Sequence, residues 1–149
     1  MKLIIQSEAE TQKLANRFHE LISLPLIVGF KGDLGVGKTA FIRNLIRCYK
    51  IDERVKSPTF SLIEEYNYTN VNIQHVDLYR LNKDEEYLAD IYDFQKKDSL
   101  ILIEWVENDL RLLKNSDIII DIFILDEKNH REIVFNGLSS KGKQIIKNL

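Results

Sequence analysis

The residues from Gly32 to Thr39 read GDLGVGKT and fit the pattern G-x-x-x-x-G-K-[ST] at every fixed position. The glycines allow positive φ angles and leave no Cβ in the path of an anion, so successive backbone N–H groups can point at a phosphate. Lys38 supplies a cation for the β and γ phosphates, and the Thr39 hydroxyl can bind Mg²⁺. We therefore predict a turn that binds a nucleoside triphosphate, the alternative being a glycine turn that only joins a strand to a helix. Its predicted contacts are Gly32, Asp33, Leu34, Gly35, Val36, Gly37, Lys38, Thr39 and Ala40.

A carboxylate must manage the magnesium ion or the attacking water, and Glu104 is the candidate. It stands at the carboxyl end of the apolar run LILIE, Leu100–Glu104, which has the composition of a buried strand. In open α/β sheets, ligands lie beyond the carboxyl ends of the strands. We expect Glu104 to lie opposite Thr39, so both are predicted metal-binding residues, and Glu104 is also a predicted catalytic residue. A solvated glutamate at a strand end is the alternative.

Two further polar clusters are SPTF, Ser57–Phe60, and HVDLYR, His75–Arg80. Thr59 can reach magnesium or the γ-phosphate, as a switch threonine would. Asp77 can lie in the outer shell of magnesium or orient water, and Arg80 can meet a phosphate or a partner. We predict catalytic roles for Thr59 and Asp77. Taken alone, a turn with a capping threonine and a surface Asp/Arg pair also explain these clusters.

The base of the nucleotide is predicted to be adenine. Guanine-specific proteins use N-K-x-D, and the segment NKDE, Asn82–Glu85, has a glutamate where the aspartate belongs. No D-x-x-G follows an expected strand either, which weakens a guanine-nucleotide switch. The predicted cofactors are therefore ATP and Mg²⁺. The histidines His19, His75 and His130 share no ligand spacing with Cys48, so a zinc site built by the protein is not expected.

These residues need a sheet and helices to hold them, and the apolar patterns indicate both. Ser7 with Glu10 is a capping box at the start of a helix, and Leu26–Phe30 is apolar on both faces, as a central parallel strand requires. Further helices are expected over Lys38–Arg47, Lys83–Lys97 and the C-terminal SSKGKQIIKNL. Extended segments are expected over Phe60–Tyr68 and Val71–Leu81 (a hairpin), Ser99–Trp105, and Asp117–Leu125 and Arg131–Leu138 (an antiparallel pair). We therefore predict one α/β domain over residues 1–149.

Composition narrows the possible settings of this domain. A net charge of −2 argues against a chain that grips nucleic acid alone, although a small basic patch remains possible, and no DNA partner is expected. The single Cys48 permits no internal disulfide, as suits a reducing compartment. No apolar run reaches the roughly 18 residues of a membrane helix, and the N-terminus lacks a signal-peptide core. We expect a cytoplasmic protein without a membrane partner.

Four segments, in this order and at these gaps, closely resemble the bacterial TsaE (YjeE) family. They read GDLGVGKTAFIR, VKSPTFSLIEEY, HVDLYRL and LILIEWVE. The resemblance implies a P-loop NTPase fold, with a mostly parallel central sheet flanked by helices and an added antiparallel hairpin edge. It also implies that Thr11 and Arg131 lie near the nucleotide. Some positions depart from the family pattern: Ala40 replaces a frequent threonine, and Asn44 and Cys48 stand where small glycines are common.

The resemblance further implies a role as the ATPase component of tRNA threonylcarbamoyladenosine synthesis. The partner would be a TsaB–TsaD pair, in which TsaD transfers threonylcarbamoyl to an adenosine beside the tRNA anticodon. ATP hydrolysis would permit repeated turnover by that complex, and tRNA would be contacted indirectly. Because no arginine-rich lid is visible, we expect a slow ATPase that its partners stimulate. A small-molecule kinase and a non-catalytic ATP-sensing module are the alternatives.

Overall fold

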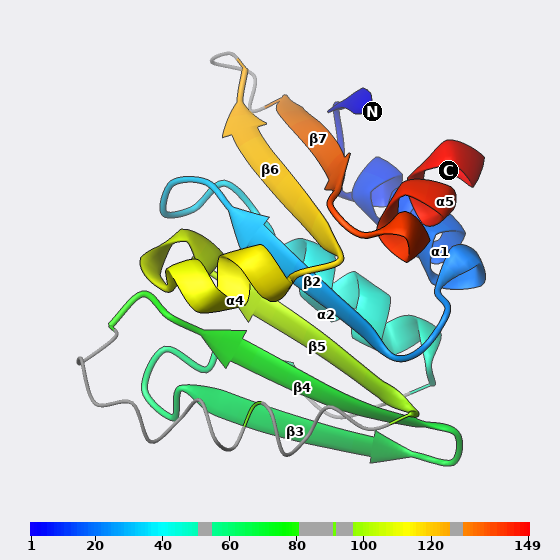
Figure 1. The fold of residues 1–149 in the computed structure, drawn as a ribbon. Coiled ribbons are helices and arrows are strands. Elements are labelled where there is room, and N and C mark those ends of the chain that lie inside the picture. Colours follow the sequence, from blue (N-terminus) through cyan, green and yellow to red (C-terminus); the bar gives the residue numbers. More distant parts are fainter. Residues whose placement is uncertain (51–54, 81–90, 92–96, 126–129) are drawn as a thin grey trace.

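The computed structural model describes residues 1–50, 55–80, 91, 97–125 and 130–149. These residues form a seven-stranded sheet in the order β1-β7-β6-β2-β5-β4-β3, with helices packed against it (Figure 1). The strands are β1 (Lys2–Ile5), β2 (Leu26–Lys31), β3 (Ile63–Tyr68), β4 (Val71–Asp77), β5 (Ser99–Glu104), β6 (Ile118–Ile124) and β7 (Arg131–Gly137). The helices are α1 (Glu8–Leu21), α2 (Lys38–Cys48), α4 (Leu110–Asn115) and α5 (Ser140–Asn148), with a 3₁₀ turn η1 (Val106–Asn108).

The four strands β6, β2, β5 and β4 at the centre of the sheet run parallel. Antiparallel strands close both edges: β3 pairs with β4, β7 with β6, and β1 with β7. This arrangement confirms the predicted α/β fold with a mostly parallel centre and antiparallel edges. The arrowheads of the parallel strands point to one edge of the sheet, at the left of Figure 1, where the turn between β2 and α2 also lies. Ligands of parallel sheets bind at such an edge.

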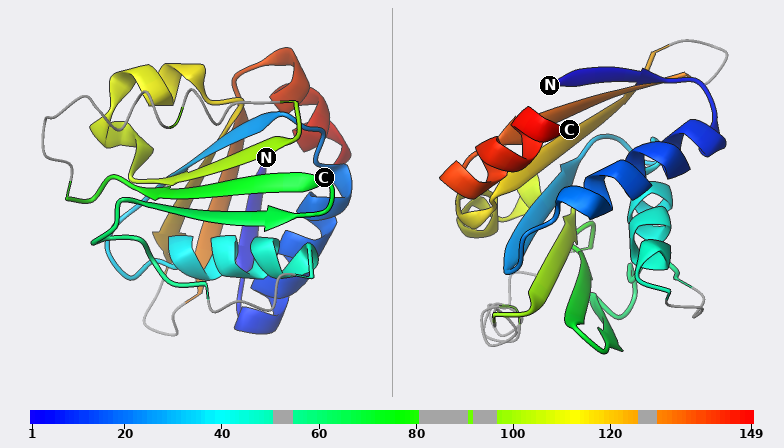
Figure 2. Two further views of the ribbon diagram at one scale, coloured as in Figure 1. Left: turned by 90° about the horizontal axis from the view of Figure 1, so that it is seen from below. Right: turned by 90° about the vertical axis from the view of Figure 1, so that its right-hand side faces the viewer.

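Side chains alternate between the two faces of the central strands. In β2, Leu26, Val28 and Phe30 belong to a core cluster shared with α1, α2 and α5. Ile27 points to the other face and belongs to a second cluster, which includes Val106 of η1 and Leu112 of α4. The left view in Figure 2 shows α2 and α4 on opposite sides of the sheet. Burial on both faces explains why the central strands read as continuous apolar runs.

Helix α1 begins where its capping pattern predicts. The Ser7 side chain accepts a hydrogen bond from the Glu10 backbone N–H at 3.2 Å, and the Glu10 carboxylate accepts one from the Gln6 N–H at 2.7 Å. The first bond satisfies an orphan donor of the first helical turn, and the second ties the residue before the N-cap to the helix. Further along α1, Phe18 packs against Phe41 of α2 with 6.3 Å between the ring centroids. Across the described segments, no helix combines the length and apolar character needed to cross a bilayer.

Gly29 in the middle of β2 lies against Val106 of η1. A Cβ at this position would lie 2.6 Å from Cγ1 of Val106 and 2.8 Å from Cδ1 of Ile119. Real Cβ atoms essentially never come this close to another atom, so a side chain at position 29 would force Val106 or Ile119 to shift.

Several elements differ from their predicted bounds. Strand β1, η1 and α4 are absent from the sequence prediction, because short segments carry little periodic signal. Strand β3 begins at Ile63, three residues after its predicted start at Phe60, and β4 ends at Asp77. The helix predicted over Lys83–Lys97 lies almost wholly outside the described residues, as does the NKDE segment.

Candidate functional site

The glycine-rich turn lies between β2 and α2, and three of its residues have positive φ angles: Gly32 at 130°, Gly35 at 80° and Gly37 at 114°. This confirms the predicted backbone. A Cβ on Gly32 would lie 2.3 Å from the carbonyl oxygen of Ile122, whereas one on Gly35 or Gly37 would meet nothing within 4 Å. Gly32 is therefore needed for packing, and the other two leave the turn open to an anion.

Lys38 opens α2 and is only 4% exposed. Its Nζ donates hydrogen bonds to the carbonyl oxygens of Gly32 at 2.6 Å and Asp33 at 3.0 Å. The ammonium also lies 3.7 Å from the centroid of the Trp105 ring, a cation–π contact. Burial lowers the pKa of Lys38, and nearby carboxylates, Glu104 first among them, oppose that shift. The turn thus binds the buried ammonium group of Lys38 through its own carbonyl oxygens.

The Thr39 hydroxyl donates to the carboxylate of Glu104, at 2.8 Å from Oε1 and 3.0 Å from Oε2. This is the predicted juxtaposition of α2 with the carboxyl end of β5. A hydroxyl has one proton and two lone pairs, so Thr39 can donate to Glu104 and still present a lone pair to a cation. Mg²⁺ binds through one or two protein oxygens together with waters and substrate phosphates. Thr39 and Glu104 therefore fit a magnesium site of that kind.

Asp77, at the end of β4, lies in register with Glu104 on β5. Its Oδ2 accepts hydrogen bonds from Ser57 Oγ at 2.6 Å and Thr59 Oγ1 at 2.7 Å, and its Oδ1 accepts one from the Tyr79 N–H at 2.9 Å. The carboxylate therefore ties the segment around Thr59 to the sheet. The structure places the two predicted residues Thr59 and Asp77 together, while their catalytic roles stay predictions.

A cavity of about 600 Å³ is lined by Lys38, Thr39, Glu104, Asp77 and Thr59 together. The turn, the segment around Thr59, the end of β4 and the end of β5 all contribute to its lining. Arg80 also lines this cavity, and its guanidinium lies 4.6 Å from the ring centroid of Phe60, a side chain that is 89% exposed. The predicted metal and switch residues thus line one cavity with most of the predicted phosphate turn, whereas Val36 lines a second pocket and Gly32 and Asp33 line neither.

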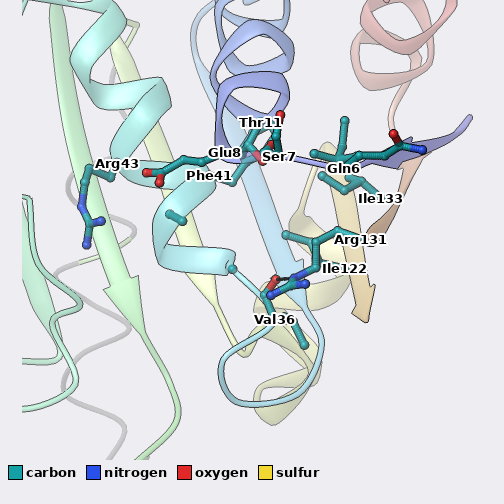
Figure 3. A pocket seen from close by; sticks show the side chains of 13 residues that line it. Gln6, Ser7, Glu8, Thr11, Val36, Phe41, Arg43, Ile122, Arg131 and Ile133 are labelled. Atoms are coloured by element: carbon teal, nitrogen blue, oxygen red, sulfur yellow. Dashed lines mark hydrogen bonds between the residues drawn. The ribbon is translucent and has the colours of Figure 1, made fainter. Parts of the chain in front are cut away.

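A second pocket, of about 490 Å³, lies between the first turn of α1, the start of α2 and the β6–β7 hairpin (Figure 3). Thr11 and Arg131 both line it. Figure 3 shows Arg131 reaching from β7 to Val36, where its Nε donates to the carbonyl oxygen at 2.7 Å. Gly37, Ala40 and Arg43 line both pockets, so the two meet at the N-terminus of α2. The two residues named from the family resemblance therefore line a pocket that reaches the turn at Val36 and Gly37.

Sequence reasoning missed one buried partner of Glu104. His75 is fully buried on β4, and its Nε2 lies 2.9 Å from Oε1 of Glu104. The available signal was the period of two along the strand, which puts His75 on the same face as Asp77. Its spacing in the sequence bears only on a zinc site, which it does not favour. Within the part of the chain that the structure describes, no three His, Cys, Asp or Glu side chains come together as a metal-binding group.

Trp105 is the second site residue that the sequence reasoning did not single out. It follows Glu104 with a left-handed backbone, at φ 57°, and its ring contacts both Lys38 and Tyr79, whose ring centroid is 4.9 Å away. A left-handed backbone is uncommon outside glycine, so the surrounding contacts must stabilise it here.

A parallel strand, a G-x-x-x-x-G-K-T turn and a helix, set at the carboxyl edge of a mostly parallel sheet, define a P-loop protein. A family model described as "Threonylcarbamoyl adenosine biosynthesis protein TsaE" matches residues 5–133. The chain belongs to the TsaE family.

Individual relatives agree with this assignment. Two proteins named "tRNA threonylcarbamoyladenosine biosynthesis protein TsaE" align along most of the chain. The protein from Haemophilus influenzae is 34% identical, over 95% of this chain and 92% of its own length. The protein from Rickettsia felis is 39% identical, over 93% and 82%. The crystal structure of YdiB from Bacillus subtilis superposes with a TM-score of 0.80 at 24% identity, covering 99% of this chain and 91% of YdiB, which shows the shared fold.

Proposed function

We propose that this chain binds ATP with Mg²⁺ and hydrolyses it, as a cytoplasmic subunit that supports threonylcarbamoyl transfer to a tRNA adenosine beside the anticodon. The single observation that carries the proposal is the contact between Thr39 and Glu104 beside the Lys38 turn. It combines a phosphate-binding backbone, a cation and a carboxylate that can hold a metal in one cavity. Membership of the TsaE family and the names of its relatives support the pathway.

The triphosphate would lie along the turn, against its inward N–H groups and the N-terminus of α2. Lys38 would exchange its hydrogen bonds to the Gly32 and Asp33 carbonyls for bonds to phosphate oxygens, which are charge-assisted and stronger. The second pocket would take the adenosine, because it meets the turn at Gly37 and is lined by Thr11 and Arg131.

Thr39 and Glu104 would hold magnesium, whose charge would stabilise the β and γ phosphate oxygens during hydrolysis. Thr39 would offer a lone pair to the metal while its hydroxyl still donates its hydrogen bond to Glu104. Asp77 keeps Ser57 and Thr59 on the side of the cavity that faces the turn. From there Thr59 would help to position the attacking water. Holding a reactant in the correct geometry accelerates its attack.

The hydrolysis would be slow in the isolated chain and faster in a complex with a TsaB–TsaD pair, with tRNA contacted through that complex. Arg80 stacks on the exposed ring of Phe60 at the cavity edge. A partner that covered Phe60 would also change the position of this guanidinium. P-loop proteins gain orders of magnitude in rate when a partner orders the switch residues or supplies a cation.

The test is phosphate release by the purified chain, the TsaB–TsaD pair and their mixture. We expect the mixture to release phosphate faster than the sum of its parts, and a complex to form in the presence of ATP. Lys38→Ala serves as the control, since it removes the phosphate contact. A mixture that equals the sum, with no complex in ATP or its non-hydrolysable analogue, would contradict the proposal and favour the kinase alternative, which a screen of phosphate acceptors then addresses. ATP-dependent complex formation without phosphate release would instead favour the ATP-sensing module.

A further inference from the structure

His75 is a buried side chain that contacts the proposed metal carboxylate without lining either cavity. It projects from β4 toward α2, on the face of the sheet that also carries Asp77 and Glu104. Its Nε2 lies 2.9 Å from Oε1 of Glu104, while its Nδ1 has no hydrogen-bond partner among the described residues. Native proteins rarely leave a buried polar atom unpaired, so the single contact that this ring makes calls for an explanation.

Glu104 is held from two sides. Thr39 of α2 donates to both carboxylate oxygens, and His75 of β4 approaches Oε1. An ionised carboxylate only accepts hydrogen bonds, so the histidine must donate to it from Nε2. A long glutamate side chain fixed by two donors from different elements keeps one orientation, in which Oε2 is shared with Thr39 alone.

We propose that His75 is a positioning residue that fixes the carboxylate of Glu104 for its work on magnesium. The magnesium ion in this inference rests on the proposed function, whereas the contact between His75 and Glu104 does not. Outer partners of metal-binding carboxylates and histidines act in this way, and their loss costs about 10- to 100-fold in metal affinity or activity. The orphaned Nδ1 fits this role, because the ring is oriented for Glu104 at the expense of its other nitrogen.

The first test needs neither nucleotide nor metal. The chain has three histidines, so long-range ¹H–¹⁵N correlation spectra of the ¹⁵N-labelled protein can resolve and assign each ring. We expect a proton on Nε2 of His75, and a clear change of its ring signals in Glu104→Ala, with His130 as the internal control. A His75 ring protonated only at Nδ1 would overturn the proposal, because its Nε2 would then have nothing to donate.

The second test compares three substitutions that differ in where they place a donor. His75→Gln puts an amide near the position of Nε2, His75→Asn puts one near Nδ1, and His75→Leu has none. We expect the asparagine and leucine variants to need about 10- to 100-fold more Mg²⁺ for half-maximal ATP hydrolysis, and the glutamine variant to stay near the parent. Nucleotide affinity measured without magnesium should be unchanged in all three.

A purely structural histidine would behave differently. It would lower the unfolding temperature and the nucleotide affinity together, without rescue by glutamine. Gln74→Leu is the matched control, since Gln74 is equally buried at the preceding position of β4 but faces the other side of the sheet. If His75→Leu fails to fold, the glutamine and asparagine variants still decide. Equal magnesium requirements in the glutamine and asparagine variants would overturn the proposed role of His75. A parent chain that never hydrolyses ATP would instead refute the proposed function, and the NMR result alone would then decide whether His75 positions Glu104.

Discussion

Helix α2 joins two regions that bury titratable side chains in different ways. At its N-terminus, Lys38, Glu104 and Asp77 are all buried beside the glycine-rich turn. At its C-terminus, a pocket of about 250 Å³ is lined by His19, Cys48 and Tyr49, among others. There the His19 and Tyr49 rings meet edge to face at 4.4 Å, and the Cys48 thiol donates to a side-chain oxygen and a backbone carbonyl.

Burial shifts the pKa values of side chains in both regions. The neutral form is favoured at one end of α2, whereas the charged form is supported at the other. At the C-terminal end it raises the pKa of Cys48 and of Tyr49 and lowers the pKa of His19, and every one of these shifts favours the neutral form. At the N-terminal end burial also lowers the pKa of Lys38, but the charges of Glu104 and Asp77 oppose it. A fold leaves charge in its interior only where an opposite charge is close. Buried opposite charges therefore distinguish the end of this helix that carries the candidate site.

The largest effect should come from removing the cation at the N-terminal end. In Lys38→Ala we expect ATP affinity to fall about 100-fold or more, since the variant loses charged hydrogen bonds to phosphate. Titration with a fluorescent ATP analogue measures this. Lys50→Ala, just beyond the other end of α2, is the control and should bind ATP as the parent does. Equal affinities in the two variants would remove the distinction between the two ends.

Neutralising the carboxylate should spare binding and slow turnover. We expect Glu104→Gln to bind ATP but to hydrolyse it about 100-fold more slowly, because it removes a charge that is proposed to act on the metal. Phosphate release at saturating ATP measures the rate. Glu20→Gln, an exposed carboxylate near the neutral pocket, should hydrolyse at the parental rate. Parental turnover by Glu104→Gln would remove Glu104 from the mechanism.

Substitutions at two glycines of the turn should distinguish a role in packing from a role in anion binding. Gly32→Ala forces a Cβ against the Ile122 carbonyl at a φ of 130°, so we expect a loss of at least about 2 kcal/mol in the free energy of unfolding. Gly35→Ala has open space and should lose about 1 kcal/mol, with its main effect on ATP affinity. Urea unfolding monitored by circular dichroism measures both variants. A larger loss in Gly35→Ala would contradict the packing role of Gly32.

The smallest effect concerns the neutral end. Because burial raises the pKa of Cys48, its thiolate fraction at pH 8 is below that of a free cysteine, and alkylation by iodoacetamide should be slower. The rate should keep rising with pH beyond the point at which a free thiol levels off. Mass spectrometry of timed samples measures the rate, and the urea-unfolded chain is the control. A native thiol that reacts as fast as the unfolded one would show that this end does not suppress charge.

The features that could be predicted from the sequence are those determined by residues close together in the chain. The turn, α2 and the capping of α1 follow from patterns within about ten residues. The contact between Thr39 and Glu104 was also predictable, because parallel strands bring their carboxyl ends to one edge. That rule needs no knowledge of which strands are neighbours.

The features that escaped prediction depend on long-range pairing. Strand β1 has four residues and exists through its ladder with β7, whose partners begin at Arg131. His75 was missed for a related reason. The sequence predicts the hairpin of Val71–Leu81 with β3, which the structure contains, but it is the parallel pairing of β4 with β5 that brings His75 toward Glu104. Periodicity gave the face of the strand, but not the neighbour beside it.

Gly29 gives the molecule a sensitive point remote from any ligand. Its missing side chain lets Val106 rest on β2, and Val106 directly follows Trp105, whose ring lies over Lys38. Any larger residue at position 29 would push η1 outward and tilt that ring. A scan of every substitution in the chain should therefore rank Gly29 with the residues of the turn, although it would touch neither phosphate nor metal. If substitutions at Gly29 reduce function, the effect would pass through the van der Waals contact between Gly29 and Val106. That contact connects the middle of β2 to Trp105 at the edge of the site.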